Sequence, residues 1–357
     1  MVSLQEGRPG WIARARAGVR ARPALQHAAA VLRSRLTSYP TTAEALRESD
    51  VYKRWWYYSV ELLPGVVTNG QYEDTFPMLP RLLLRQCGVE GADCLDMGTM
   101  EGLIPALMAR RGARSVLAVD AVPHCVEKLA AVRHYHRVRF DYQNVGLMYE
   151  LDKKLPGRSF DLINCSGLLY HVMSPFMVLA GVRPLLRKNG LIVVSTNVVD
   201  TDEHMMEFNA AGRLQRELNT FWYVSIPLLD YVLRYLALAP LDVVYVSLGP
   251  SERLRTGSNA GFLSVVCRAV DAPLSSADDT WMSPSVRESW ESKGLVDWDR
   301  TRRNPASSIR YHGAAAGEDL RSDTGSLDLA RAVRRASALP IPPKPSDTHR
   351  LALADAS

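Results

Sequence analysis

Short apolar runs alternate with helical apolar spacings along the middle of the chain. The run 94–97 has the length of a buried strand, and apolar residues then recur at helical spacing over 103–108. Basic residues and a glycine at 110–112 are typical of a helix end. A second apolar run, 116–119, follows and ends on Asp120. This order of strand, turn, helix and strand predicts the first half of a nucleotide-binding α/β unit.

The turn after the first strand indicates which ligand the unit binds. Asp96, Gly98 and Gly102 form the pattern D-x-G-x-x-x-G, whereas a dinucleotide site has G-x-G-x-x-G and a P-loop has Gly-Lys-Ser/Thr. An acid before the glycines suits a ligand with an amino-acid ammonium and no phosphates, and S-adenosylmethionine is such a ligand. Gly98 allows the backbone to approach it closely, and Asp120 can accept both ribose hydroxyls. The alternative is an ordinary crossover whose glycine caps the helix.

Further apolar runs predict the rest of the sheet and the helices that cover it. The remaining strands are expected at 138–142, 159–165, 191–196, 241–248 and 261–268, the last of them antiparallel. Helices are expected at 123–136, where a proline begins the helix, at 176–187 and at 226–237. The predicted fold class is α/β, with a mostly parallel seven-stranded sheet and helices on both faces.

Polar side chains follow the carboxyl ends of these strands, where ligands bind in open α/β sheets. Tyr170 and His171 follow the fourth strand, and an imidazole has the pKa of a general base near neutral pH, although a structural histidine is the alternative. Glu203 and His204 follow the fifth strand as further candidate catalytic groups, or else as part of a solvated acidic loop. The expected cofactor contacts are Asp96, Gly98, Thr99, Gly102, Asp120, Ala121, Asn144, Val145, Ser166 and Tyr170, with Asn144 near the adenine.

Two aromatic stretches, 55–58 and 219–223, flank this core in the sequence. The first precedes the first strand, where rings can cover the cofactor and attract its sulfonium by cation–π interaction. A hydrophobic cover over the edge of the sheet is the alternative. The candidates for acceptor binding are Trp56, Tyr58, Glu61, Asn197, Phe221 and Trp222.

Charge and cysteine content restrict the partners. The net charge is +5, but residues 51–270 carry only +2, which argues against a partner held mainly through phosphates. Five scattered cysteines indicate reduced core thiols in a cytoplasmic protein, and no Cys/His spacing predicts a metal site. No apolar run has the length of a membrane span.

The D-x-G-x-x-x-G turn, the acid at Asp120 and the order of the elements resemble the Rossmann-like class I S-adenosylmethionine-dependent methyltransferases. Within that family the block 166–175 is similar to the bacterial tRNA wobble-uridine carboxymethyltransferases, as is 219–223; the similarity spans roughly residues 90–250. The segment before the first strand lacks the Lys with which that group holds its modified cofactor, and Gly261-Phe262 stands where an Arg is expected. The resemblance therefore implies unmodified S-adenosylmethionine, with Tyr170 on the cofactor side.

The two ends of the chain differ from this core in composition. Residues 1–49 are rich in Ala and Arg and are expected to form a basic arm or helix; a targeting peptide is the alternative. Residues 50–270 are the predicted methyltransferase domain. Residues 271–357 are an extension, expected to dock partly through its tryptophans and to be largely disordered after about residue 312.

The sequence thus predicts an enzyme that transfers a methyl group to oxygen or carbon of a small-molecule acceptor, a secondary metabolite. Residues 56–62 resemble small-molecule methyltransferases that share this core. A tRNA-modifying enzyme, whose basic arm contacts phosphates, and a non-catalytic cofactor-binding scaffold are the alternatives. A homo-oligomer is compatible with the N-terminal helix. Methyl transfer depends largely on positioning, and a base is needed only where the acceptor loses a proton.

Overall fold

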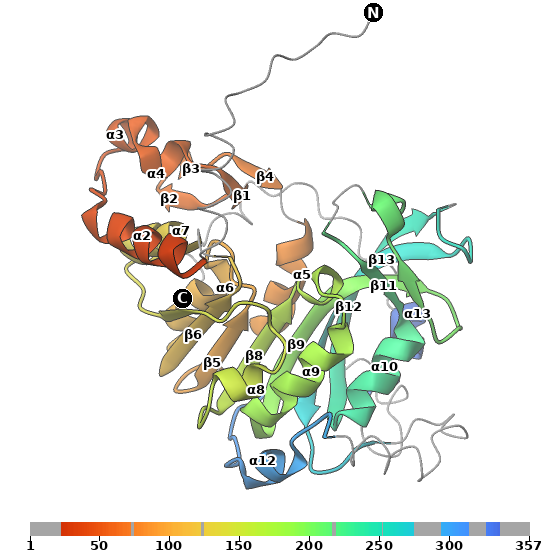
Figure 1. The fold of residues 1–357 in the computed structure, drawn as a ribbon. Helices are drawn as coiled ribbons and strands as arrows, with labels where there is room; N and C mark the ends of the chain where they lie inside the picture. The colour runs from red at the N-terminus through yellow and green to blue at the C-terminus, as the bar shows by residue number, and fades with distance from the viewer. Residues whose placement is uncertain are drawn as a thin grey trace, which may run out of the picture.

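The computed structural model describes residues 23–72, 75–122, 125–215, 219–251, 253–274, 294–313 and 326–335. Nine strands of these residues form one sheet (Figure 1). Its main strands are β5 (Asp93–Met97), β6 (Ser115–Asp120), β7 (Asp141–Asn144), β8 (Phe160–Ser166), β9 (Leu186–Asp200), β12 (Leu238–Pro250) and β13 (Asn259–Ala269). They lie in the order β7-β6-β5-β8-β9-β13-β12, with β13 antiparallel to both of its neighbours and the first five parallel. The predicted mostly parallel α/β sheet is confirmed.

Two short strands extend the sheet beyond the predicted seven. β11 (Trp222–Ser225) pairs parallel with the carboxyl end of β9, and β10 (Met206–Phe208) pairs antiparallel with β11. They lie at the same edge of the sheet as the residues that follow β5, β6 and β8. Trp222 and Tyr223 of the second aromatic stretch are therefore part of the sheet.

Helices cover both faces of the sheet, as predicted. α5 (Thr75–Leu84), α6 (Leu103–Arg110) and α7 (Cys125–His136) pack on one face, and α8 (Leu151–Lys154), α9 (Pro175–Val182) and α10 (Ile226–Tyr235) on the other. Alternate strand residues enter the two cores: Cys94 belongs to the first, and Leu95 and Met97 to the second. The first core also holds Cys87 and Cys125, and the second Cys165 and Cys267; all five cysteines are free and buried, which confirms the predicted core thiols.

An N-terminal layer lies over the α6–α7 side of the sheet (Figure 1). It consists of α2 (Pro23–Leu36), α3 (Ala43–Glu48), α4 (Asp50–Lys53), β1 (Trp56–Tyr58), β2 (Glu61–Leu63), β3 (Val66–Val67) and β4 (Gly70–Tyr72). α2 packs along α7, where Arg33 pairs with Glu127. The predicted N-terminal helix is thus present over 23–36, the arm continues through 37–49 with α3, and residues 1–22 lie outside the described residues.

Most element boundaries differ from the prediction by a few residues, and β9, at Leu186–Asp200, is longer at both ends than the predicted 191–196. β7 begins at Asp141 and not at 138. The helix predicted over 176–187 ends at Val182, and a 3-10 turn, η2 (Arg183–Leu185), leads into β9. Pro184 has no N–H for a helical hydrogen bond, so the helix does not continue through it. The buried guanidinium of Arg183 donates to the carbonyl oxygens of Leu236 and Val270. The expected proline at the start of α7, Pro123, lies outside the described residues.

Part of the C-terminal extension packs on the domain. α12 (Trp298–Arg303) brings Trp298 against the core, whereas Trp281 and Trp290 lie outside the described residues. α13 (Leu329–Arg335) contacts α10, and its Leu329, Ala332 and Val333 are buried. The segment 313–357 was expected to be mostly disordered, and within it residues 326–335 are ordered on the domain, because these apolar residues share one helical face. No helix among the described residues combines the length and hydropathy required to cross a membrane.

Candidate active site

Two adjoining cavities lie beyond the carboxyl ends of β5, β6 and β8. They share five lining residues and are together called the cleft here; the larger has a volume of about 210 Å³. The shared residues are Tyr58, Gly98, Ser166, Gly167 and Tyr170. Of the expected cofactor contacts, Asp96, Gly98, Thr99, Asp120, Ala121, Ser166 and Tyr170 line the cleft. Gly102, Asn144 and Val145 are not among its lining residues.

The glycine turn between β5 and α6 is shaped by left-handed backbone. Gly98 and Gly102 have φ of 71° and 83°, and Met100 between them has φ of 46° although it carries a side chain. A Cβ atom on Gly102 would lie 2.6 Å from Cδ2 of Leu129 in α7. Gly102 therefore serves the close packing of the turn on α7, which corrects its expected role as a cofactor contact.

Asp120 ends β6 in the wall of the cleft and holds the glycine turn in place. Its Oδ2 accepts a hydrogen bond from the Met100 N–H (3.0 Å), and its Oδ1 accepts one from the Val122 N–H (2.9 Å). Carboxylate oxygens have additional lone pairs, so both oxygens retain capacity for a ligand's hydroxyl groups. The arrangement fits the ribose of S-adenosylmethionine.

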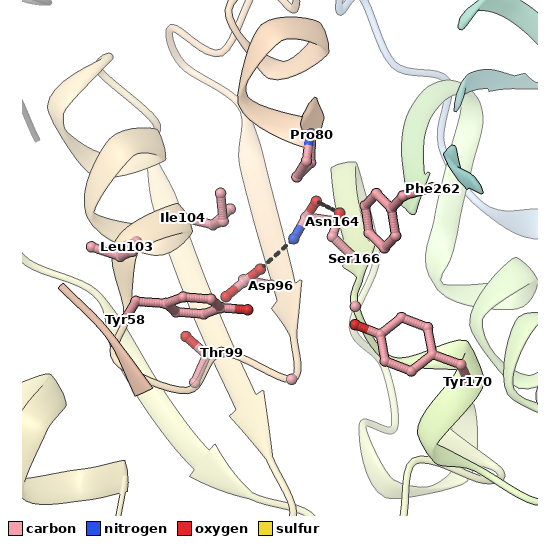
Figure 2. Close-up of a pocket in the computed structure, with 12 residues that line it drawn as sticks. Tyr58, Pro80, Asp96, Thr99, Leu103, Ile104, Asn164, Ser166, Tyr170 and Phe262 are labelled. Carbon is pink, nitrogen blue, oxygen red and sulfur yellow. Dashed lines mark hydrogen bonds between the residues drawn. The ribbon is translucent and has the colours of Figure 1, made fainter. Parts of the chain in front are cut away.

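Asp96 places a buried carboxyl group at the floor of the cleft (Figure 2). Its Oδ1 accepts a hydrogen bond from Nδ2 of Asn164 (2.7 Å), and Asn164 Oδ1 accepts one from the Ser166 hydroxyl (2.6 Å). Burial raises the pKa of Asp96 to about 7. Its Oδ2 is buried and has no hydrogen-bond partner among the described residues. An unpaired buried carboxylate oxygen beside a cleft fits the ammonium of the cofactor's methionyl group.

Aromatic rings form the other walls. Tyr58 from β1 and Tyr170 from the 3-10 turn η1 (Leu169–His171) reach into the cleft from opposite sides, and Phe262 lies beside Tyr170 (Figure 2). The Tyr170 and Phe262 ring centroids are 6.4 Å apart. The carbonyl oxygen of Tyr170 accepts a hydrogen bond from the Phe221 N–H (2.6 Å), which fixes η1 to the segment before β11.

His171 follows Tyr170 at the outer part of the cleft. Its Nδ1 lies 2.9 Å from the carbonyl oxygen of Asn219, and both residues line the cleft. A carbonyl oxygen only accepts hydrogen bonds, so Nδ1 carries the proton in this contact. Nε2 then holds the ring's lone pair, as a general base requires.

Three candidates for acceptor binding from the aromatic and polar stretches lie outside the cleft. Trp56 is fully buried in the core, where its Nε1–H donates to the Val51 carbonyl oxygen (3.2 Å). Glu61 accepts the Gly65 N–H (2.6 Å) and closes the β2–β3 turn. Asn197 is buried and donates to Oε1 of Gln215 (3.2 Å). Their side chains serve the local structure.

The segments after β9 also differ from the expectation. Glu203 and His204 are exposed and are not among the residues that line the cleft. Phe221 stacks on Phe208, with 6.4 Å between ring centroids. Trp222 lines a separate apolar cavity of about 540 Å³ between α9 and α10, and its Nε1–H donates to the Met173 carbonyl oxygen (3.1 Å). Of the six acceptor candidates, only Tyr58 lies in the cleft.

Several residues of the site were not anticipated from the sequence. The cleft is also lined by Asn164, Asn219, Tyr57 and Phe262, and the Asn219 carbonyl oxygen bonds to His171. Glu101, inside the glycine turn, is completely buried. A polar residue within the apolar strand 160–166 was a usable signal for Asn164, whereas Asn219 and Phe262 are brought in by long-range pairing.

Comparison with known proteins agrees with this geometry. Residues 72–227 match the model of a family described as a methyltransferase domain. Ubiquinone biosynthesis O-methyltransferase of Xanthomonas campestris is 35% identical over 143 residues, which cover 40% of this chain and 56% of that protein. The enzyme of the same name from Pseudomonas paraeruginosa is 28% identical over 158 residues, covering 43% and 62%. The chain thus spans less than two thirds of the length of these relatives.

A solved structure with a similar arrangement is the N-terminal domain of EvdMO1 with SAH bound. Its TM-score is 0.45 at 18% identity, and the match covers 63% of this chain and 96% of that one. The family match extends from β4 to the start of α10 and so contains the glycine turn, Asp120 and His171.

Proposed function

We propose that this chain, whose residues 72–227 match a family described as a methyltransferase domain, is an S-adenosylmethionine-dependent enzyme that transfers the cofactor's methyl group to an oxygen of a small-molecule acceptor. The observation that supports this most is that one cleft contains both the Asp96 oxygen without a hydrogen-bond partner among the described residues and the His171 imidazole. The first suits a cationic ligand, and the second suits removal of a proton from an acceptor.

The chain's own residues would hold the cofactor at its two polar ends. Asp96 faces the methionyl ammonium, and Asp120 accepts from the ribose hydroxyls. When bound, S-adenosylmethionine supplies an electrophilic methyl group on a sulfonium. Tyr58 and Tyr170 present ring surfaces and hydroxyl groups to the space between these ends and His171, where they exclude water and orient the acceptor.

The lining of the cleft favours a planar, partly apolar acceptor. Three tyrosine rings, those of Tyr57, Tyr58 and Tyr170, border it. The two relatives described above are named as O-methyltransferases, which supports oxygen over carbon as the accepting atom. A phenolic metabolite, including a secondary metabolite, combines these features.

His171 would act as the general base for such an acceptor. The proton of the acceptor hydroxyl moves to Nε2 while Nδ1–H remains on the Asn219 carbonyl oxygen. With the methyl group supplied by the bound cofactor, transfer would leave a methyl ether, the neutral thioether of the cofactor and a protonated His171 imidazole.

Transfer of labelled methyl groups tests the proposal. The purified chain is incubated with methyl-tritiated S-adenosylmethionine and a panel of phenols and catechols, with total tRNA as a separate acceptor. We expect label in an organic-soluble methyl ether, lost in His171→Gln and retained in the exposed-histidine control His204→Gln. Cofactor binding without label in any acceptor would instead support the non-catalytic scaffold.

A tRNA acceptor stays the alternative because the block 166–175 resembles tRNA wobble-uridine enzymes. It requires tRNA binding that weakens steeply with salt and is lost when residues 1–40 are removed. Label in tRNA with none in the small molecules would replace the proposed acceptor class. A cytoplasmic location and a homo-oligomeric state likewise remain proposals.

A further inference from the structure

We propose that Glu101, which is buried in an ion pair with Lys128, is a positioning residue: its side-chain oxygen accepts the Tyr57 N–H and so fixes the aromatic wall to the glycine turn. The aromatic wall is defined as residues 55–58, of which Tyr57 and Tyr58 line the cleft and Trp56 is buried in the core. This inference rests on the proposed function only for its binding measurement; the anchoring itself is a property of the free protein.

The ion pair joins three elements that surround the cleft. Glu101 lies in the glycine turn, Lys128 in α7, and the two side chains are almost completely buried. Oε1 of Glu101 accepts hydrogen bonds from Nζ of Lys128 (2.6 Å) and from the N–H of Tyr57 in β1 (2.8 Å). One carboxylate oxygen therefore connects the turn, the helix and the aromatic wall.

The same ion pair contacts the aromatic wall a second time through Lys128. Its ammonium lies 4.4 Å from the ring centroid of Trp55 and 6.0 Å from that of Trp56. Trp56 is anchored in the core by its bond to the Val51 carbonyl oxygen. The first two residues of the wall, Trp55 and Trp56, are thus fixed by their contacts with Lys128 and the core. The third, Tyr57, is fixed by its hydrogen bond to Glu101.

Tyr57 and Tyr58 carry this anchoring into the cleft. Both line it, and their ring centroids are 4.7 Å apart in an edge-on contact. The turn that bears Glu101 is itself fixed by the bond from the Met100 N–H to Asp120. The position of Tyr58 relative to Asp96 and Asp120 is therefore set through Glu101.

Stability alone is an insufficient reason for this arrangement. A buried ion pair is commonly no more stabilising than apolar residues of the same volume. Oε2 of Glu101 is buried without a hydrogen-bond partner among the described residues, so part of the desolvation cost is not offset. What an apolar pair does not supply is an acceptor for the Tyr57 N–H, and this acceptor is the feature that the experiment isolates.

Two double variants separate positioning from packing. Both E101Q/K128M and E101L/K128M remove both charges, but only Gln keeps an acceptor oxygen for the Tyr57 N–H. Hydrogen exchange of residues 55–58 in the free protein is the first measurement. We expect slow exchange of the Tyr57 amide in wild type and E101Q/K128M, and fast exchange in E101L/K128M, at similar thermal stability.

Calorimetric titration with S-adenosylmethionine is the second measurement. We expect an affinity close to wild type in E101Q/K128M and one about tenfold weaker in E101L/K128M, the equivalent of one lost hydrogen bond at the wall. Equal exchange and equal affinity in the two variants would overturn the proposal and leave a purely structural ion pair.

Two controls complete the test. If either double variant does not fold, E101D is used, which keeps the charge on a shorter side chain. It should accelerate hydrogen exchange at residues 55–58. Hydrogen exchange equal to that of wild type would overturn the proposal. If wild type binds no S-adenosylmethionine, the proposed function fails, while the exchange measurement still decides whether Glu101 anchors the wall.

Discussion

The two sides of the cleft are built in different ways. On the cofactor side, Asp96, the glycine turn and Asp120 come from one stretch of 25 residues, and the Met100 N–H of the same stretch bonds to Asp120. On the acceptor side, His171 and Tyr170 bond to Asn219 and Phe221, about 50 residues further along the chain. The first side is organised locally, and the second depends on the pairing of β11 with β9.

Burial follows the same division. Asp96 and Asp120 are buried, whereas His171 and Asn219 are in part accessible to solvent. A buried, locally fixed side suits a constant ligand such as the cofactor, and an open side suits an acceptor that enters and leaves. Substitutions on the two sides should therefore affect different measured constants.

Loss of the candidate base should produce the largest effect. His171→Gln should lower kcat by about 100-fold or more, since general-base catalysis contributes at least that factor. The dissociation constant of S-adenosylmethionine should stay within about twofold, because His171 lies on the acceptor side. Steady-state kinetics with the labelled cofactor and calorimetry measure the two constants. A parallel loss of both would show that the sides are not separable.

Close packing of the glycine turn predicts a large loss of stability. Gly102→Ala should lower the free energy of unfolding by about 3 kcal/mol, from left-handed strain together with overpacking against Leu129. Gly146→Ala is the matched control: Gly146 also has positive φ but open space around it, so about 1 kcal/mol is expected. Urea unfolding measures both, and equal losses would contradict the packing role.

Asp96 should make cofactor binding depend on pH. In the folded protein its pKa is about 7, above the ordinary carboxyl value. The Asp96 carboxyl group of the free protein is therefore mostly protonated below pH 7 and becomes ionised as the pH rises above it. A cationic ammonium favours the ionised form. Affinity should thus increase as pH rises through about 7, by several-fold between pH 6 and 8. Calorimetry of Asp96→Asn, which keeps the acceptor for Asn164, should show a flat profile; the same slope in the variant would contradict the assignment.

The smallest effect is expected for the residues after β9. Glu203→Gln and His204→Gln should change kcat and KM by less than about twofold, because exposed side chains outside a site are usually neutral to substitution. The same kinetic assay checks this. A tenfold fall in either variant would place the loop after β9 in the acceptor side.

The difference between the two sides also explains what the sequence could predict. The spacing of apolar residues and the glycine turn predicted β5, α6 and β6 and the roles expected of Asp96 and Asp120, because these patterns depend on residues that are close together in the sequence. Met100 illustrates the limit even there, since a residue with a side chain adopts φ of 46° where a glycine would be expected. Its backbone is held by Asp120, twenty residues away.

The acceptor side was predicted less well for a physical reason. Trp56 and Tyr58 are two residues apart in an aromatic run, yet one is in the core and the other in the cleft. The residue types within the run do not distinguish the two positions. Phe262 enters the cleft because β13 inserts between β9 and β12. Such placements follow from pairings between distant segments, which a local pattern does not contain.

Calorimetric titration of the full chain with S-adenosylmethionine, on wild type and Asp120→Ala, tests the central claim most directly. Wild type should bind one equivalent, and the variant should bind at least about 100-fold more weakly, because the N–H groups of Met100 and Val122 lose their charged acceptor and the ribose loses its acceptor as well. Asp141→Ala, an exposed acid on neighbouring β7, should bind like wild type. Absence of binding by folded wild type, or equal binding by Asp120→Ala, would contradict a cofactor site at the glycine turn.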